Sequence, residues 1–182
     1  TLVIDGRVRL SCSALVDDLL LASGSDTITL QPMSKFPNVR DLKVDRSKMF
    51  EHLKKVEAWI ELDGSYGLGP GPQISDEIAQ ERYAYSRCMT CGSCLEACPQ
   101  YGDDNYIGPQ AIAQARLFNM HPVGAITKEE RLNGLLGDDG IGNCGNAQNC
   151  VKVCPMSVPL TKAIYETNRD ITVDALFGWL KK

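Results

Sequence analysis

Residues 88–99 read CMTCGSCLEACP, with four cysteines spaced Cys-x2-Cys-x2-Cys-x3-Cys before a proline. In bacterial ferredoxins this spacing lets three cysteines hold one iron–sulfur cluster while the fourth ligates a second cluster. Thiolates also bind zinc, but structural zinc sites usually pair two Cys-x2-Cys hooks and leave no place for a third cysteine at this spacing. This first cysteine run therefore predicts iron–sulfur clusters, with a structural zinc-binding interaction module as an alternative.

Residues 144–155 read CGNAQNCVKVCP and repeat the first run with Ala147 in place of its second cysteine. Two four-iron clusters need one thiolate for each iron, about eight in all, and the two runs supply only seven. If the runs exchange their fourth cysteines, one cluster has three ligands, and a cube with an unligated corner readily loses that iron. The predicted ligands of a [4Fe-4S] cluster are Cys88, Cys91, Cys94 and Cys154. The predicted ligands of a [3Fe-4S] cluster are Cys98, Cys144 and Cys150.

Good helix formers separate Cys94 from Cys98, so in a helix the two residues lie about 6 Å apart along the axis and on one face. The two predicted clusters are therefore close neighbours. Adjacent one-electron centres without an obvious substrate pocket predict electron relay, in which the cofactors carry the chemistry and the protein sets spacing and tuning.

The composition of the 182-residue chain is that of a globular protein, with 43% hydrophobic and 23% charged residues. The net charge of -4 and the lack of a dense Lys/Arg cluster predict no nucleic-acid partner. The apolar runs are too short for a spanning helix. Cysteines at metal-ligand spacing favour a reducing compartment over a disulfide framework. Because the chain begins at Thr1 without a methionine or a signal sequence, we expect it to be a fragment.

The period of the apolar residues changes along the chain. Alternation predicts strands near residues 1–4, 8–10 and 27–30, with Asp5-Gly6 as a two-residue hairpin turn. Beyond Val44 the period becomes helical, so we expect an α+β fold with domains at 1–44 and 45–182. The expected helices cover 49–60, 76–85 after the N-cap Ser75, 111–120 and 160–168, and the glycine- and proline-rich segment 64–72 is expected to be a loop.

Three side chains outside the cysteine runs carry weaker expectations. His52 is expected on the exposed polar side of its helix, and His121 is expected in a turn that ends a helix. Trp59 is expected to be a packing residue.

Several stretches of the chain resemble the iron–sulfur subunit of succinate dehydrogenase and fumarate reductase, in its menaquinone-linked branch. They occur in that family's order and are residues 36–46, 69–72, 88–99, 107–109 and 144–155. The resemblance implies the remnant of a β-grasp [2Fe-2S] ferredoxin domain, followed by an α-helical ferredoxin domain. Cys12 matches the fourth ligand of a plant-type [2Fe-2S] cluster, whose other ligands would precede Thr1.

The resemblance also implies partners and a place in the cell. Electrons would pass between an FAD-containing flavoprotein subunit and menaquinone in a membrane-anchor cytochrome b subunit. The chain would lie at the cytoplasmic face of the cell membrane, peripheral through those subunits and without the dicarboxylate site. Pro99 is the one residue that the resemblance carries to the quinone pocket. Iron–sulfur subunits of the heterodisulfide-reductase-like or glycolate-oxidase-like kind are an alternative, but they ordinarily have two full cysteine runs, and Ala147 counts against them.

Overall fold

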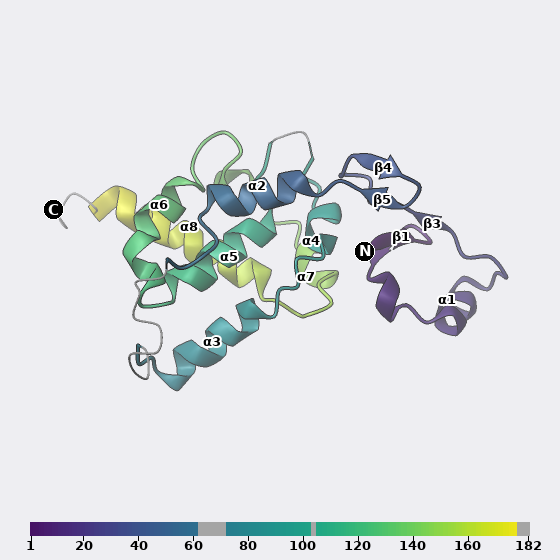
Figure 1. Ribbon diagram of the computed structural model, residues 1–182, viewed down its shortest axis with the longest axis horizontal. Helices are drawn as coiled ribbons and strands as arrows, with labels where there is room; N and C mark the ends of the chain where they lie inside the picture. The colour runs from purple at the N-terminus through teal and green to yellow at the C-terminus, as the bar shows by residue number, and fades with distance from the viewer. Residues whose placement is uncertain (62–71, 103–104, 178–182) are drawn as a thin grey trace.

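The strands lie at one end of the protein and most of the helices at the other in a computed structural model that describes residues 1–61, 72–102 and 105–177 (Figure 1). The combination confirms an α+β fold. The predicted loop at 64–72 falls almost wholly outside the described residues.

The N-terminal sheet is built around a hairpin. Strands β1 (Leu2–Ile4) and β2 (Arg7–Arg9) pair antiparallel, and β3 (Leu30–Gln31) pairs antiparallel with the other edge of β1. Asp5 and Gly6 have φ of 47° and 74°, the left-handed values that a type I′ turn requires, so the hairpin predicted at this dipeptide is confirmed. The strand expected at 27–30 is shorter and later than predicted.

Three further elements of the N-terminal part were not expected from the sequence. Helix α1 (Val16–Ser23) ends at Gly24, which adopts the left-handed conformation typical of helix ends. Strands β4 (Asn38–Arg40) and β5 (Lys43–Val44) form a second antiparallel hairpin beside the helical part (Figure 1).

Helix α2 (Ser47–Lys55) ends earlier than the predicted 49–60. The backbone turns at Glu57, whose φ is 45°, so the helix does not continue. Arg131, which is 1% exposed, donates hydrogen bonds to the carbonyls of Glu57 at 2.9 Å and Trp59 at 2.8 Å and so holds the segment that follows α2. Trp59 is 43% exposed, so its expected packing role is wrong. His52 is half-buried, not on the surface, and its ring meets Tyr101 edge-on at 5.9 Å between centroids.

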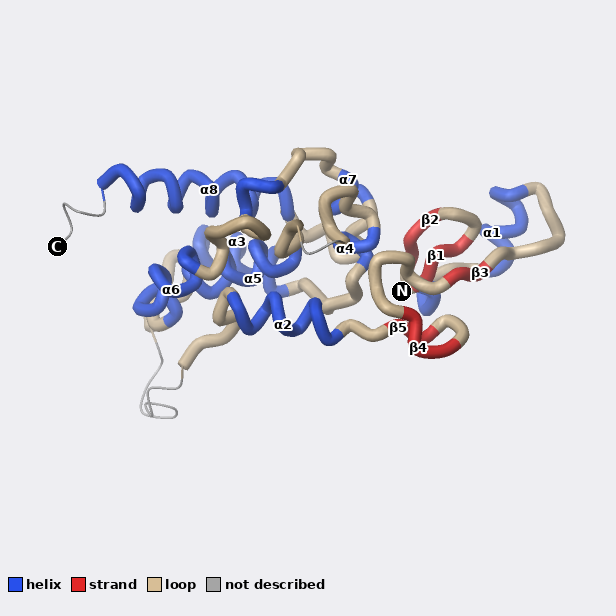
Figure 2. Tube along the Cα trace, turned by 90° about the horizontal axis from the view of Figure 1, so that it is seen from above, coloured by secondary structure: helices blue, strands red, loops and turns tan. Residues whose placement is uncertain are grey.

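Helix α5 (Pro109–Asn119) is the centre of the helical part and packs against α2, α3, α4, α6 and α8 (Figure 2). It begins with Pro109, whose missing N–H costs nothing at a first helical position. Helix α3 (Asp76–Ser86) is capped as predicted, because Ser75 Oγ accepts from the Ile78 N–H at 3.3 Å. The remaining helices are α4 (Ser93–Glu96), α6 (Lys128–Asn133), α7 (Asn149–Lys152) and α8 (Leu160–Phe177).

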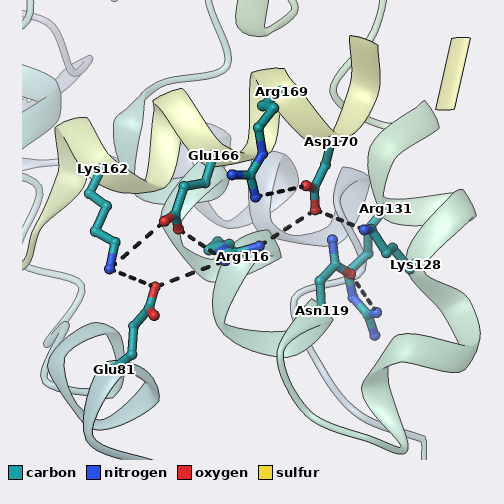
Figure 3. A network of polar contacts seen from close by, with 9 residues as sticks. All are labelled: Glu81, Arg116, Asn119, Lys128, Arg131, Lys162, Glu166, Arg169 and Asp170. Carbon is teal, nitrogen blue, oxygen red and sulfur yellow. Dashed lines mark hydrogen bonds and ion pairs between the residues drawn. The ribbon is translucent and has the colours of Figure 1, made fainter. Parts of the chain in front are cut away.

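Ion pairs join α3, α5, α6 and α8 (Figure 3). Arg116 of α5 contacts Glu166 at 2.9 Å and Asp170 at 3.5 Å on α8, and Lys128 of α6 meets Asp170 at 2.7 Å. These contacts continue past Asn168, which is why α8 runs farther than the predicted 160–168. No helix among the described residues combines the length and apolar character needed to cross a membrane.

Candidate metal centres

A cavity gathers four cysteines from both runs. We call it the four-thiol cavity, and its cysteines are Cys88, Cys91, Cys94 and Cys154. Cys154 comes from the second run, after α7, whereas the other three come from the first. Apolar residues such as Met156, Val158 and Leu160 complete the wall.

A second cavity gathers the remaining three cysteines of the runs. We call it the three-thiol cavity, and its cysteines are Cys98, Cys144 and Cys150. Ala147 lines this cavity too, where a fourth thiol would stand if the second run were complete. Among the described residues, no group of three or more His, Cys, Asp or Glu side chains is placed to hold a single metal ion. An iron–sulfur cluster takes one thiolate per iron, so its ligands surround a larger core than one ion.

The two runs adopt matching backbone conformations. In the first loop Thr90 and Gly92 have φ of 51° and 82°, and in the second loop Asn146 and Gln148 have φ of 52° and 60°. Left-handed residues of this kind turn backbone N–H groups into a concavity, an arrangement found at many iron–sulfur sites. A single helical turn, α4 or α7, follows each loop and presents the next cysteines.

Burial dominates the chemistry of the thiols. It raises the pKa of Cys88 and Cys150 and raises that of Cys94 well above its ordinary value. The backbone N–H of Thr90 acts in the opposite direction and lowers the pKa of Cys88. The Val158 N–H donates to Cys154 Sγ at 3.3 Å. A thiol with a raised pKa keeps its proton, and metal binding must release it.

Each cavity also contains one buried polar side chain whose donor has no oxygen or nitrogen partner among the described residues. In the three-thiol cavity it is the hydroxyl of Tyr106, which is 2% exposed and has only the thiol of Cys144 within reach. In the four-thiol cavity it is Nε2 of Gln110, also 2% exposed. Soft thiolates are the ligands that iron–sulfur clusters require, and cluster sulfurs accept hydrogen bonds. The cavities therefore suit iron–sulfur clusters in two respects: their cysteines can serve as ligands, and their buried donors can form hydrogen bonds to cluster sulfurs.

Two predicted site residues lie apart from the cysteine sets. Cys12 is exposed, in the 3-10 turn Ser11–Ser13, and lines neither cavity. One thiolate does not hold a [2Fe-2S] cluster, so Cys12 alone would not form the predicted site. Pro99 is exposed, lines the three-thiol cavity, and also borders an open polar hollow with Tyr101 and Asn143.

Comparison with protein families assigns both ends of the chain. A family described as "2Fe-2S iron-sulfur cluster binding domain" matches residues 1–51, and one described as "4Fe-4S dicluster domain" matches residues 84–158. With the fold and the two cavities, these matches define the class: an iron–sulfur protein made of two ferredoxin-type domains.

Individual relatives narrow this class. The succinate dehydrogenase iron-sulfur subunit of Bacillus subtilis is 51% identical over 96% of this chain and 68% of its own length. The fumarate reductase iron-sulfur subunit of Wolinella succinogenes is 29% identical over 95% of this chain and 72% of its own length. The chain belongs to the family of succinate dehydrogenase and fumarate reductase iron–sulfur subunits. It is an electron-transfer subunit of that oxidoreductase, which confirms the resemblance found in the sequence.

A solved structure supports the fold. A chain of the Mycobacterium smegmatis Sdh1 complex in the apo form matches with a TM-score of 0.76 and 24% identity, over 96% of this chain and 72% of that one. The match includes strands and helices together, so the α+β arrangement belongs to the family fold.

Proposed function

We propose that the four-thiol cavity holds a [4Fe-4S] cluster and the three-thiol cavity a [3Fe-4S] cluster, which together relay single electrons between a flavoprotein subunit and membrane menaquinone. The support for this ligand assignment is that each cavity is lined by cysteines of both runs, with Cys154 and Cys98 exchanged between them. Ala147 at the wall of the second cavity supports three ligands there.

When bound, such clusters supply one-electron redox chemistry. The chain contributes binding, spacing and exclusion of water. Cys94 lies in the helical turn α4 and Cys98 follows two residues after its end, so this one element sets the separation of the two cavities. Leu95 and Ile107, each 1% exposed, keep water from the wall behind them. A dry environment and fixed hydrogen bonds are the means by which a protein sets cluster potentials.

The two ends of the relay follow from the placement of Cys12 and Pro99. We assign Cys12, in the β-rich part, to the fourth ligand of a [2Fe-2S] cluster that faces an FAD-containing flavoprotein subunit. We place the quinone pocket at Pro99, beside the three-thiol cavity, where a membrane-anchor cytochrome b subunit would meet the chain. The protein would then lie on the cytoplasmic face of the cell membrane, held there by its partners.

Metal analysis with electron paramagnetic resonance (EPR) tests the cluster assignment. An oxidised [3Fe-4S] cluster has an odd electron and an oxidised [4Fe-4S]2+ cluster does not. The oxidised complex should therefore show a three-iron signal, and dithionite reduction should replace it with the signal of the reduced four-iron cluster. A fully loaded complex without a signal when oxidised would overturn the assignment, and zinc without acid-labile sulfide would support the zinc-binding module.

Two cysteine variants test the exchange of ligands. Cys154→Ser should remove the [4Fe-4S] signal although this residue lies in the second run, and Cys98→Ser should remove the [3Fe-4S] signal although it lies in the first. Cys12→Ser is the matched control, because its side chain lines neither cavity and both signals should persist. If each variant instead loses the cluster of its own run, the assignment is wrong.

A further inference from the structure

Two side chains stand out among the buried polar groups of the helical part. Tyr106 and Gln110 are both 2% exposed. Gln110 Nε2 has no hydrogen-bond partner among the described residues, and the Tyr106 hydroxyl has none there except the thiol of Cys144, which lies within its reach. Burying a donor without a partner costs free energy, so natural proteins rarely keep such groups without a reason. Tyr106 lines the three-thiol cavity and Gln110 lines the four-thiol cavity.

Both donors come from one short segment that runs from Tyr106 into the start of α5. The Ile107 N–H donates to the carbonyl of Asp139 at 2.7 Å and fixes the segment on one side. Gly108 has a φ of 94°, and a Cβ there would collide with the side chain of Leu95 in α4. The segment therefore packs closely against α4. Its first residue, Tyr106, lies at the three-thiol cavity, and its last, Gln110, lies at the four-thiol cavity.

The neighbours of the Tyr106 ring are sulfur atoms. Burial raises the pKa of Tyr106, and the nearby thiols of Cys144, Cys98 and Cys150 raise it further, with Cys144 within reach of the hydroxyl. A phenol is protonated at neutral pH and donates one hydrogen bond, and a glutamine amide donates two. When a cluster is bound, its thiolate and sulfide sulfurs would be the hydrogen-bond acceptors for these two donors.

We propose that Tyr106 and Gln110 each donate a hydrogen bond to a sulfur of the cluster in their own cavity, and that each raises the reduction potential of that cluster alone. This inference rests on the proposed function, because it requires a cluster in each cavity. Reduction adds one electron, and therefore negative charge, to the cluster. A donor aimed at its sulfur stabilises the reduced state more than the oxidised state, and hydrogen bonds to sulfur are one of the factors that set cluster potentials.

Paired variants of the full-length chain, purified in its complex, test the inference by redox titration followed by EPR. Tyr106→Phe keeps the ring and removes the hydroxyl, and should shift the one-electron equilibrium of the [3Fe-4S] cluster about tenfold toward the oxidised form, about 59 mV. Gln110→Leu should do the same to the [4Fe-4S] cluster. In each variant the other cluster should keep its potential.

Tyr85→Phe is the matched control. Tyr85 is fully buried, but its hydroxyl faces the guanidinium of Arg116 and not a thiol, and the residue lines neither cavity. It should leave both potentials unchanged. The inference is overturned if Tyr106→Phe and Gln110→Leu leave the potentials unchanged, if each shifts both clusters equally, or if Tyr85→Phe has the same effect.

Two further measurements address other outcomes. In D2O, electron–nuclear double resonance on the oxidised [3Fe-4S] signal should detect an exchangeable deuteron that Tyr106→Phe removes, and an unchanged spectrum contradicts the inference. If Tyr106→Phe loses the cluster, protein made with 3-fluorotyrosine, a stronger donor, should raise the [3Fe-4S] potential relative to the other cluster, whose cavity has no tyrosine in its wall. A failure to load clusters of the assigned types would instead overturn the proposed function.

Discussion

The loop from Cys88 to Cys98 and the loop from Cys144 to Cys154 share a backbone path but not their side chains. Each has left-handed residues two and four positions after its first cysteine, and each leads into a single helical turn, α4 or α7. The fourth cysteine of each lines the cavity served mainly by the other loop. The two cysteine runs that repeat in the sequence therefore also repeat in backbone structure.

Three of the matched positions that differ have a physical consequence. Where the first loop has Cys91, the second has Ala147, so the second cavity has one thiol fewer than the first. Gly92 of the first loop corresponds to Gln148, and Glu96 to Lys152. The backbone is thus the part of the site that is duplicated, while cluster type and contacts to the rest of the protein are set by single side chains.

The largest effect is expected from restoring the missing cysteine. Ala147→Cys places a fourth thiol in the three-thiol cavity and should convert its cluster from [3Fe-4S] to [4Fe-4S]. The EPR signal of the oxidised complex should disappear, and the potential of that cluster should fall by at least about 59 mV, a tenfold change in the one-electron equilibrium. Ala147→Ser is the control, because it adds a similar volume without a thiol. A persistent three-iron signal in Ala147→Cys would show that position 147 is not equivalent to position 91 as a ligand position.

Cysteine spacing predicted which side chains meet, because ligand number and reach are local properties of the chain. It grouped Cys154 with the first run and Cys98 with the second, and the two cavities bring together the same groups. It did not point to Tyr106 or Gln110. Their importance depends on burial and on the absence of oxygen or nitrogen partners among the described residues, and both arise only when distant elements pack.

The fold shows the same division between local and distant causes. The Asp5-Gly6 turn and the Ser75 cap were predicted because each depends on a few adjacent residues. The end of α2 was missed because the segment after the backbone turn at Glu57 is held by Arg131, which lies far along the chain and donates to the carbonyls of Glu57 and Trp59. The exposure of Trp59 was missed with it, because this residue lies in the same segment.

A smaller effect is expected from exchanging the left-handed residues of the loops. Gly92→Ala should destabilise the loaded protein by about 1–2 kcal/mol, since a Cβ disfavours a φ of 82° and meets its neighbours only at ordinary contact distance. Gln148→Gly should stabilise it by about 0.5–1 kcal/mol, because relief of the left-handed strain exceeds the entropy that glycine adds to the unfolded chain.

Thermal unfolding of the two variants measures these effects, and a change of about 1 kcal/mol corresponds to about 2–4 °C in a protein of this size. The shifts should have opposite signs. If Gln148→Gly lowers the unfolding temperature, Gln148 stabilises its loop by contacts that outweigh its backbone strain, and the two loops are less alike in energy than in conformation.

The smallest effect concerns the side chains that follow the loops. The Glu96 carboxylate accepts from the Ser34 N–H at 2.9 Å, the Ser34 hydroxyl at 2.7 Å and the Lys35 N–H at 3.1 Å, and so binds α4 to the β-rich part. Glu96→Gln turns one acceptor into a donor facing an N–H, and should cost about 1 kcal/mol in a partly exposed site. Its counterpart Lys152 borders an open groove, and Lys152→Gln should change stability by less than about 0.5 kcal/mol. Equal losses in the two variants would show that the second loop also anchors the β-rich part, which would remove this difference between the loops.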